Sequence, residues 1–189
     1  MIQPNPSGDL PQVDPSAYVD PTAQIIGKVR VGPRVFVGPN AVIRADEPDK
    51  SGCVAPIEIG FDCNVQDGVI VHALAGAWVT IRPQTSLSHG CVVHGPCVVG
   101  NRCFVGFRAV VFDAELAEGV FVGPGAVVCH VQLPAHALVP AGAAIQSPEQ
   151  AAKLASTGSA ERAFMEEVVA MNVRLAEGYA QRGRDGNHE

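Results

Sequence analysis

Residues Val13–Ile43 read VDPSAYVDPTAQIIGKVRVGPRVFVGPNAVI, with a branched aliphatic residue at every sixth position. After interruptions the same period resumes and continues to Val128, with one five-residue step. A small residue, often alanine, valine or cysteine, follows many of these positions four residues later. Self-similarity at a fixed period predicts a stack of short, equivalent units.

This pattern resembles the hexapeptide repeat of the left-handed parallel β-helix, in which three hexapeptides form one triangular coil. The handedness follows from the resemblance, not from the spacing. Grouping the repeats in threes predicts six coils, with Pro134 and Pro140 heading a partial seventh. The predicted fold is mainly β: a left-handed parallel β-helix of about seven coils with a C-terminal α-helix, its coils stacked at about 4.7–4.9 Å.

Two interruptions of the period predict loops that leave the coil, at residues 46–56 (DEPDKSGCVAP) and 73–80 (ALAGAWVT). The second interruption comes directly after His72. Functional groups are often placed on such loops, because a rigid scaffold positions them.

Helical signals replace the six-residue period near its C-terminal end. Residues 147–150 (SPEQ) have the spacing of a capping box, with proline at the first helical position, and a second helix is predicted from near Ser159. Its apolar stripe is predicted to pack along the coil or a neighbouring subunit and comprises Phe164, Val168, Met171, Leu175 and Tyr179. The predicted parts are a β-helix domain at residues 1–146, a helical segment packed on it at 147–183, and a polar tail at 184–189.

Composition and charge argue against several classes of partner. The chain has 189 residues and 47% hydrophobic content, which favours one domain with a sizeable core. A formal net charge of −6 gives no reason to expect nucleic acid or an anionic membrane as partner, since both reward clustered Lys and Arg. The sequence shows neither a leader pattern nor a run of 18 apolar residues, so we expect a cytoplasmic protein.

Four of the six cysteines fall on the small interior position of the repeat, which predicts packing rather than disulfides: Cys63, Cys91, Cys97 and Cys103. Cys53 lies in the first predicted loop and Cys129 at an outward position, and a redox role for either stays open. The sequence contains no CxxC pair, which argues against a cysteine zinc site.

Three of the six histidines lie within 23 positions: His72, His89 and His94. His72 and His94 directly follow interior valines of adjacent coils on one face, so their side chains are predicted to stand one above the other. His89 falls near a corner, on a different face. One protomer could thus bring two imidazoles to a metal, and a neighbouring subunit of a trimer could supply the third.

Three neutral imidazoles with an open fourth position form the arrangement of a catalytic zinc site, which lowers the pKa of bound water to about 7. The alternative is that these are surface histidines on a repetitive scaffold. Two histidines at equivalent positions of stacked coils, with a third nearby in the chain, favour the metal site.

Five segments carry a specific resemblance: IRADE (43–47), NVQDGVIVH (64–72), SLSHGCVVHGP (86–96), VGFRAVVF (105–112) and NVRLAEGY (172–179). They resemble the γ-class carbonic anhydrases and their relatives, including the N-terminal domain of a carboxysome scaffold protein. The resemblance implies a homotrimer with metal sites at the subunit interfaces, in which His72 and His94 of one chain meet His89 of the next. It implies Zn²⁺ as the metal, with Fe²⁺ or Co²⁺ as alternatives.

The resemblance also assigns polar residues to the site. Gln66 and Asn64 match positions that hydrogen-bond metal-bound water or bicarbonate, and Asn172 matches a C-terminal pocket residue. Amides suit this task because they donate and accept hydrogen bonds without a change of charge. For Asn64, a purely structural role in a turn is the alternative.

Three charged residues match a salt-bridge group that ties subunits together near the site: Arg44, Asp46 and Asp67. Independently of the resemblance, Arg44 occupies the outward position one coil before His72, and Asp67 and His89 occupy matching positions on successive coils. These residues are therefore predicted to pair at the trimer interface, with a solvated surface pair worth under about 1 kcal/mol as the alternative.

The chain departs from the family pattern in the loop after His72. The resemblance implies a glutamate there that carries protons to buffer, but this loop contains no acid. Glu47, which matches a second acidic residue of the family, is the remaining candidate proton acceptor, and a solvated loop charge is its alternative role.

The predicted function is zinc-dependent, reversible hydration of carbon dioxide to bicarbonate. Two alternatives remain open. One is a non-catalytic, metal-binding trimeric scaffold or complex subunit, which the missing loop acid favours. The other is a hexapeptide-repeat acyltransferase or thioesterase, which leaves the three histidines unexplained.

Overall fold

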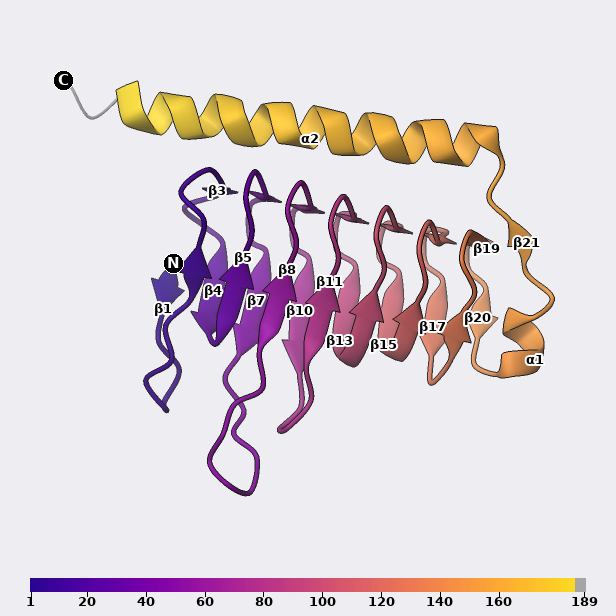
Figure 1. The fold of residues 1–189 in the computed structure, drawn as a ribbon, viewed down its shortest axis with the longest axis horizontal. Coiled ribbons are helices and arrows are strands. Elements are labelled where there is room, and N and C mark those ends of the chain that lie inside the picture. The colour runs from indigo at the N-terminus through magenta and orange to yellow at the C-terminus, as the bar shows by residue number, and fades with distance from the viewer. Residues whose placement is uncertain (186–189) are drawn as a thin grey trace.

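The protein is a single β-helix with one long helix along its side (Figure 1). The structure, a computed structural model, describes the backbone of residues 1–185 and the side chains of residues 1–182. Nearly every strand pair is parallel, and each strand pairs with its equivalent in the next coil. The predicted left-handed β-helix of about seven coils with a C-terminal helix is confirmed.

The strands build three faces. The first face consists of β1 (Ile2–Gln3), β4 (Gln24–Gly27), β7 (Val42–Ala45), β10 (Ile70–Ala73), the first parts of β13 (Val92–Val99) and β15 (Val110–Leu116), β17 (Val127–Cys129) and β20 (Ala144–Ile145). The second face consists of β3 (Tyr18–Val19), β6 (Phe36–Val37), β9 (Asn64–Val65), β12 (Ser86–Leu87), β14 (Phe104–Val105), β16 (Phe121–Val122), β19 (Ala137–Val139) and β21 (Ala155–Ser156). The third face consists of β2 (Gln12–Val13), β5 (Val29–Val31), β8 (Ile57–Ile59), β11 (Val79–Ile81), the last parts of β13 and β15, and β18 (Gln132–Leu133).

The six-residue period fills the interior of the coil. The branched positions Ile25, Ile43, Val65, Val71 and Val93 are fully buried. Because successive side chains of a strand point to opposite faces, the residue that follows each interior position points outward. The period therefore determines which residues are available to a site.

The four cysteines on the small interior position are buried and free, as predicted. Burial raises the pKa of Cys63, Cys91 and Cys103 to about 12 and that of Cys97 to about 11. Their role is packing.

Both predicted loops leave the coil next to the first face. The first occupies residues 46–56, between β7 and β8, and projects from the side of the β-helix opposite α2 (Figure 1). The second is shorter than predicted. Ala73 pairs with Gly95 and Val79 with Cys97, so strand pairing continues into both ends of the segment and only residues 74–78 leave the coil.

The chain ends in two helices, α1 (Pro148–Ala151) and α2 (Ser159–Asp185). The Ser147 hydroxyl accepts a hydrogen bond from the Gln150 amide, as a helix cap should. The Gln150 side chain, however, accepts from the amide of Gln146 rather than from that of Ser147, so the predicted capping box is only partly formed. The second helix begins at the predicted residue.

The apolar stripe of α2 is only partly covered. Phe164 packs edge-on against Phe104, with ring centroids 5.2 Å apart, and Tyr179 stacks on Tyr18 at 4.6 Å. Met171 and Leu175 stay exposed, and the most deeply buried residues of the helix are Met165, Asn172 and Ala176. The predicted stripe therefore lies only partly within the contact between α2 and the coil.

The C-terminal end of α2 lies beyond the predicted boundary of the helical segment. The helix runs to Asp185, whereas the prediction placed a tail from residue 184. Residues 186–189 of that tail lie outside the described residues. None of the helices in residues 1–185 combines the length and apolar character needed to cross a bilayer.

Candidate metal centre

His72 and His94 stand one above the other on the first face. They occupy paired positions of β10 and β13, and Arg44 of β7 occupies the equivalent position one coil earlier. Nδ1 of His72 lies 3.3 Å from Nε2 of His94. The placement predicted from the spacing of the repeat is confirmed for all three residues.

The surroundings of His72 favour the neutral form of its imidazole. Burial lowers the pKa of His72, and the nearby Arg44 guanidinium lowers it further. Nη2 of Arg44 lies 3.1 Å from Nε2 of His72, which places a permanent positive charge beside this ring. Nδ1 of His94 lies 3.1 Å from the carbonyl oxygen of Gly95 and donates to it, which orients the ring with Nε2 towards His72.

This pair fits half of a zinc site. Nitrogen ligands at 2.0–2.1 Å from a tetrahedral zinc ion are about 3.3–3.4 Å apart, which matches the nitrogen separation of His72 and His94. A metal ligand must be unprotonated, and ligating histidines commonly donate their other N–H to a backbone carbonyl, as His94 does.

Two carboxylates flank His72. Oε1 of Glu47 lies 3.4 Å and Oδ1 of Asp46 lies 3.6 Å from its Nε2. Asp46 also pairs with Arg44 through its other oxygen, at 3.3 Å. Oδ1 of Asp46 is buried and has no hydrogen bond within the described part of the chain. An unsatisfied buried carboxylate oxygen is costly, so a further donor is expected at this position.

His89 lies on the corner between the second and first faces. Its Nδ1 is 3.5 Å from Oδ2 of Asp67, and its ring stacks on Phe107 with centroids 5.7 Å apart. The amide of Gly90 donates to the carbonyl of Asp67, so the two side chains occupy equivalent corners of successive coils, as predicted. The side chain of His89 is 53% exposed and therefore available to another molecule.

The predicted amide residues form one cluster at this same corner. Nε2 of Gln66 donates to Oδ1 of Asn172 at 2.6 Å and to Oδ1 of Asn64 at 3.1 Å. Nδ2 of Asn64 donates to Oγ of Ser86 at 2.7 Å, and Nδ2 of Asn172 to the carbonyl of Val168 at 2.9 Å. We call Gln66, Asn64, Asn172, Ser86 and His89 the corner cluster. Sequence reasoning missed Ser86, although its place one coil above Asn64 follows from the period.

One protomer does not bring all the predicted ligands together. Among residues 1–185, no three His, Cys, Asp or Glu side chains are grouped closely enough to hold a metal ion. His89 sits on a corner, whereas His72 and His94 project from the first face. The protomer therefore carries two separate parts, the imidazole pair with its carboxylates and the corner cluster.

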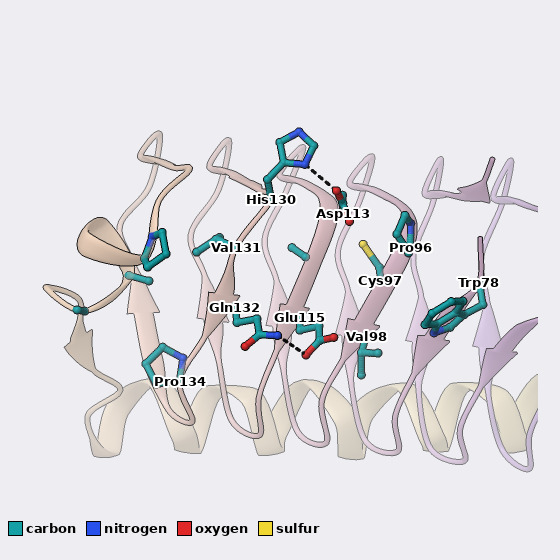
Figure 2. A pocket seen from close by; sticks show the side chains of 14 residues that line it. Trp78, Pro96, Cys97, Val98, Asp113, Glu115, His130, Val131, Gln132 and Pro134 are labelled. Carbon is teal, nitrogen blue, oxygen red and sulfur yellow. Dashed lines mark hydrogen bonds and ion pairs between the residues drawn. The ribbon is translucent and has the colours of Figure 1, made fainter. Parts of the chain in front are cut away.

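A cavity of about 840 Å³ contains none of the predicted site residues. Figure 2 shows it around the corner between the first and third faces, where His130 points at Asp113 and Gln132 at Glu115. The ring of Phe112 packs edge-on against the rings of both His94 and His130, with centroids 5.3 and 5.1 Å apart. This cavity is distinct from the candidate metal centre.

Comparisons with known proteins agree with the geometry. The chain is 36% identical to the carbonic anhydrase of Methanosarcina thermophila, over 94% of this chain and 78% of that protein. It is 37% identical to the carboxysome assembly protein CcmM of Synechocystis over 88% of this chain, and it spans only about a quarter of that protein's length (25%). No protein-family model matches the chain.

Two solved structures of other proteins have the same fold. A putative acetyltransferase of Bacillus cereus superposes with a TM-score of 0.81 at 26% identity, over 96% of this chain and 97% of that one. A hexapeptide transferase family protein of Anaplasma phagocytophilum gives a TM-score of 0.73 at 27% identity, over 95% and 98% of the chains. The fold is thus shared with proteins described as transferases, and the site residues must decide between functions.

Proposed function

We propose, from the premise that the chain belongs to the γ-class carbonic anhydrase family, that it hydrates carbon dioxide reversibly to bicarbonate at a metal centre shared between subunits. The observation that carries this proposal is the pair of stacked imidazoles whose nitrogens are 3.3 Å apart on one face of the coil. The corner cluster supplies the complementary part: an exposed histidine at the same row of corners as the oriented amides.

A homotrimer would complete the site. His72 and His94 of one subunit and His89 of the next would hold Zn²⁺, or alternatively Fe²⁺ or Co²⁺. Apolar side chains that surround the two parts are exposed in the single chain, which supports an interface there: Ile70, Phe107, Met171 and Leu175. Asp67 is half-exposed, and Oδ1 of Asp46 has no donor among the residues that the structure describes, so both have acceptor capacity left for a neighbouring subunit.

A zinc ion with three neutral imidazole ligands and one open position supplies hydroxide at neutral pH, because it lowers the pKa of water to about 7. The residues of this chain then orient the reactants. Gln66 is held by Asn64 and Asn172, so its amide is fixed before any ligand arrives. Such preorganisation of polar groups is a large contribution to catalysis.

Hydration releases one proton for each bicarbonate formed, and a base must remove it. Glu47 is the proposed acceptor, because its carboxylate lies 3.4 Å from His72 and is 39% exposed to solvent. Residues 74–78 contain no acid, so no carboxylate in this loop assists. We therefore expect proton removal, rather than the chemistry of CO₂, to limit turnover.

The test is metal analysis with a mass measurement in solution, followed by ¹⁸O exchange between CO₂ and water on metal-loaded protein. We expect a trimer with about one metal per chain and exchange above the buffer background. His94→Ala should abolish both metal binding and exchange. A metal-loaded trimer with no exchange would remove the enzymatic claim.

A non-catalytic metal-binding scaffold or complex subunit is the second candidate. The acid-free loop after His72 favours it, and so does the 37% identity to a protein named for carboxysome assembly. Co-purification of a stable partner with a metal-loaded but inactive trimer would select this candidate.

The two solved structures are described as transferases, so an acyltransferase or thioesterase is the third candidate function. Metal-free hydrolysis or transfer of an acyl-coenzyme A would select it. A cytoplasmic location, and the lack of nucleic-acid and membrane partners, stay predictions.

A further inference from the structure

A groove of about 580 Å³ lies between α2 and one row of coil corners, and no residue of the candidate metal centre lines it. The corner wall comes from five successive coils, each joined to the previous one by a backbone hydrogen bond: Asp62, Gln84, Arg102, Gly119 and His136. The volume lies within the range of about 300–1,000 Å³ that is typical of small-molecule sites.

The side of the groove formed by α2 is apolar in its middle and carries two arginine side chains. Met165, Val169 and Val173 line the groove at helical spacing, and Arg162 and Arg174 lie towards its two ends. Opposite them, the imidazole of His136 packs against the backbone of Gly119, where a Cβ atom would overlap the ring. A glycine at this corner therefore leaves room for the histidine.

Two charged residues of the groove are already paired. Arg102 forms an ion pair with Glu118. Asp62 accepts a two-pronged pair of hydrogen bonds from Arg34, at 2.7 and 3.0 Å. The charged side chains of the groove that are not paired in this way therefore belong to α2.

The remaining charges give the groove an excess of one positive charge. Nη1 of Arg162 donates to the carbonyl of Thr157 at 2.6 Å, a neutral acceptor that leaves the guanidinium charge uncompensated. The guanidinium of Arg174 has no hydrogen bond or ion pair in the described part of the chain, and Glu166 is the acid of the lining whose carboxylate has no such partner there. The groove is thus cationic in a chain whose formal net charge is −6.

We propose that this groove binds a small organic anion with an apolar body. The body would lie on Met165, Val169 and Val173, which removes apolar surface from water. The anionic group would accept hydrogen bonds from Arg174 or Arg162, since guanidinium groups match carboxylate, sulfonate and phosphate oxygens. This proposal does not depend on the hydration of carbon dioxide.

The test is a fluorescence titration with 8-anilinonaphthalene-1-sulfonate, an anion with an apolar body, at constant ionic strength. We expect saturable binding of about one probe per chain, and at least tenfold weaker binding in Arg174→Glu. Ala170→Trp, which fills the groove without a change of charge, should weaken binding to the same extent. Octanoate should displace the probe, and inorganic phosphate, which has no apolar body, should not.

The matched control is Lys50→Glu, which makes the same change of charge in the exposed 46–56 loop and should leave binding unchanged. Circular dichroism checks that each variant is folded. The neutral probe N-phenyl-1-naphthylamine should bind at least tenfold more weakly. The proposal is overturned if either groove variant binds like the parent protein, if Lys50→Glu weakens binding as much as Arg174→Glu, or if the neutral probe binds as tightly.

Discussion

At the scale of single residues, His72 and His94 have different neighbours although they occupy equivalent positions. His72 is buried beside Arg44 and two carboxylates, whereas His94 has a backbone carbonyl on one side and the ring of Phe112, at 5.3 Å, on the other. Each set of neighbours orients its imidazole. The amide of Gln66 is oriented in a similar way, by two other amides.

Replacing Asn172 by alanine should lower the rate of ¹⁸O exchange roughly tenfold without loss of metal, because one hydrogen bond that orients Gln66 is removed. Exchange kinetics together with metal content measure the two effects separately. Gln132→Ala is the matched control: it also removes an amide hydrogen bond, to Glu115 on the third face, and should change neither quantity. Equal effects of the two variants would contradict the proposed role.

Thiol titration tests the assignment of the cysteines. The pKa values of about 11 to 12 keep the four interior cysteines protonated up to pH 9 and above, and burial blocks the reagent. In native protein at pH 8 we expect Ellman's reagent to modify exposed Cys53 rapidly, Cys129 more slowly, and the other four only after denaturation. Cys53→Ser should remove the fast phase. More than two reactive thiols in folded protein would show that the coil interior is open.

At the scale of elements, α2 joins distant coils. It runs back along the second face, so its C-terminal half reaches the first coils (Figure 1). Tyr179 stacks on Tyr18 and contacts Phe36 at 6.3 Å. Because each coil of a repeat contacts only its neighbours, a helix that spans them adds contacts of long range.

Tyr179→Ala should lower the free energy of unfolding by about 1–2 kcal/mol, from the lost ring stacking and part of the buried area. Urea unfolding followed by circular dichroism measures the change. Glu167→Ala, at an exposed position of the same helix, should lie within about 0.5 kcal/mol of the parent protein. A similar loss in both variants would mean that helix propensity, rather than the aromatic contact, sets the effect.

At the scale of the whole molecule, the two parts of the candidate centre are separate within one protomer: the imidazole pair projects from the first face, and His89 lies on the corner between the second and first faces. A mixture of two inactive variants tests whether subunits share the site. His94→Ala keeps the corner cluster, and His89→Ala keeps the imidazole pair. In randomly mixed trimers about one quarter of the interfaces join an intact pair to an intact corner, so about a quarter of parental metal content and exchange should return.

The experiment requires both variants to be expressed together and to form trimers, which light scattering checks. Each variant alone should remain inactive. If the mixture is as inactive as its components, while mixed trimers are present, the site is not shared between subunits.

The amino-acid sequence by itself determined the fold and the stacking of His72 on His94. Equal coils convert spacing along the chain directly into position in space, so a six-residue period predicts which residues are interior and which share a face. The same reasoning placed Asp67 and His89 on one corner, and the four cysteines in the interior.

Only the tertiary structure decided how α2 lies on the coil. Asn172 meets Gln66 across 106 residues of sequence, and the cationic groove depends on which side of the helix faces the corner row. A helix is not in register with the repeat, so its rotation and offset follow from packing, with Met165 and Ala176 buried rather than Met171 and Leu175. Helical spacing gives the width of an apolar stripe, and contact with the coil selects the part of that stripe that is buried.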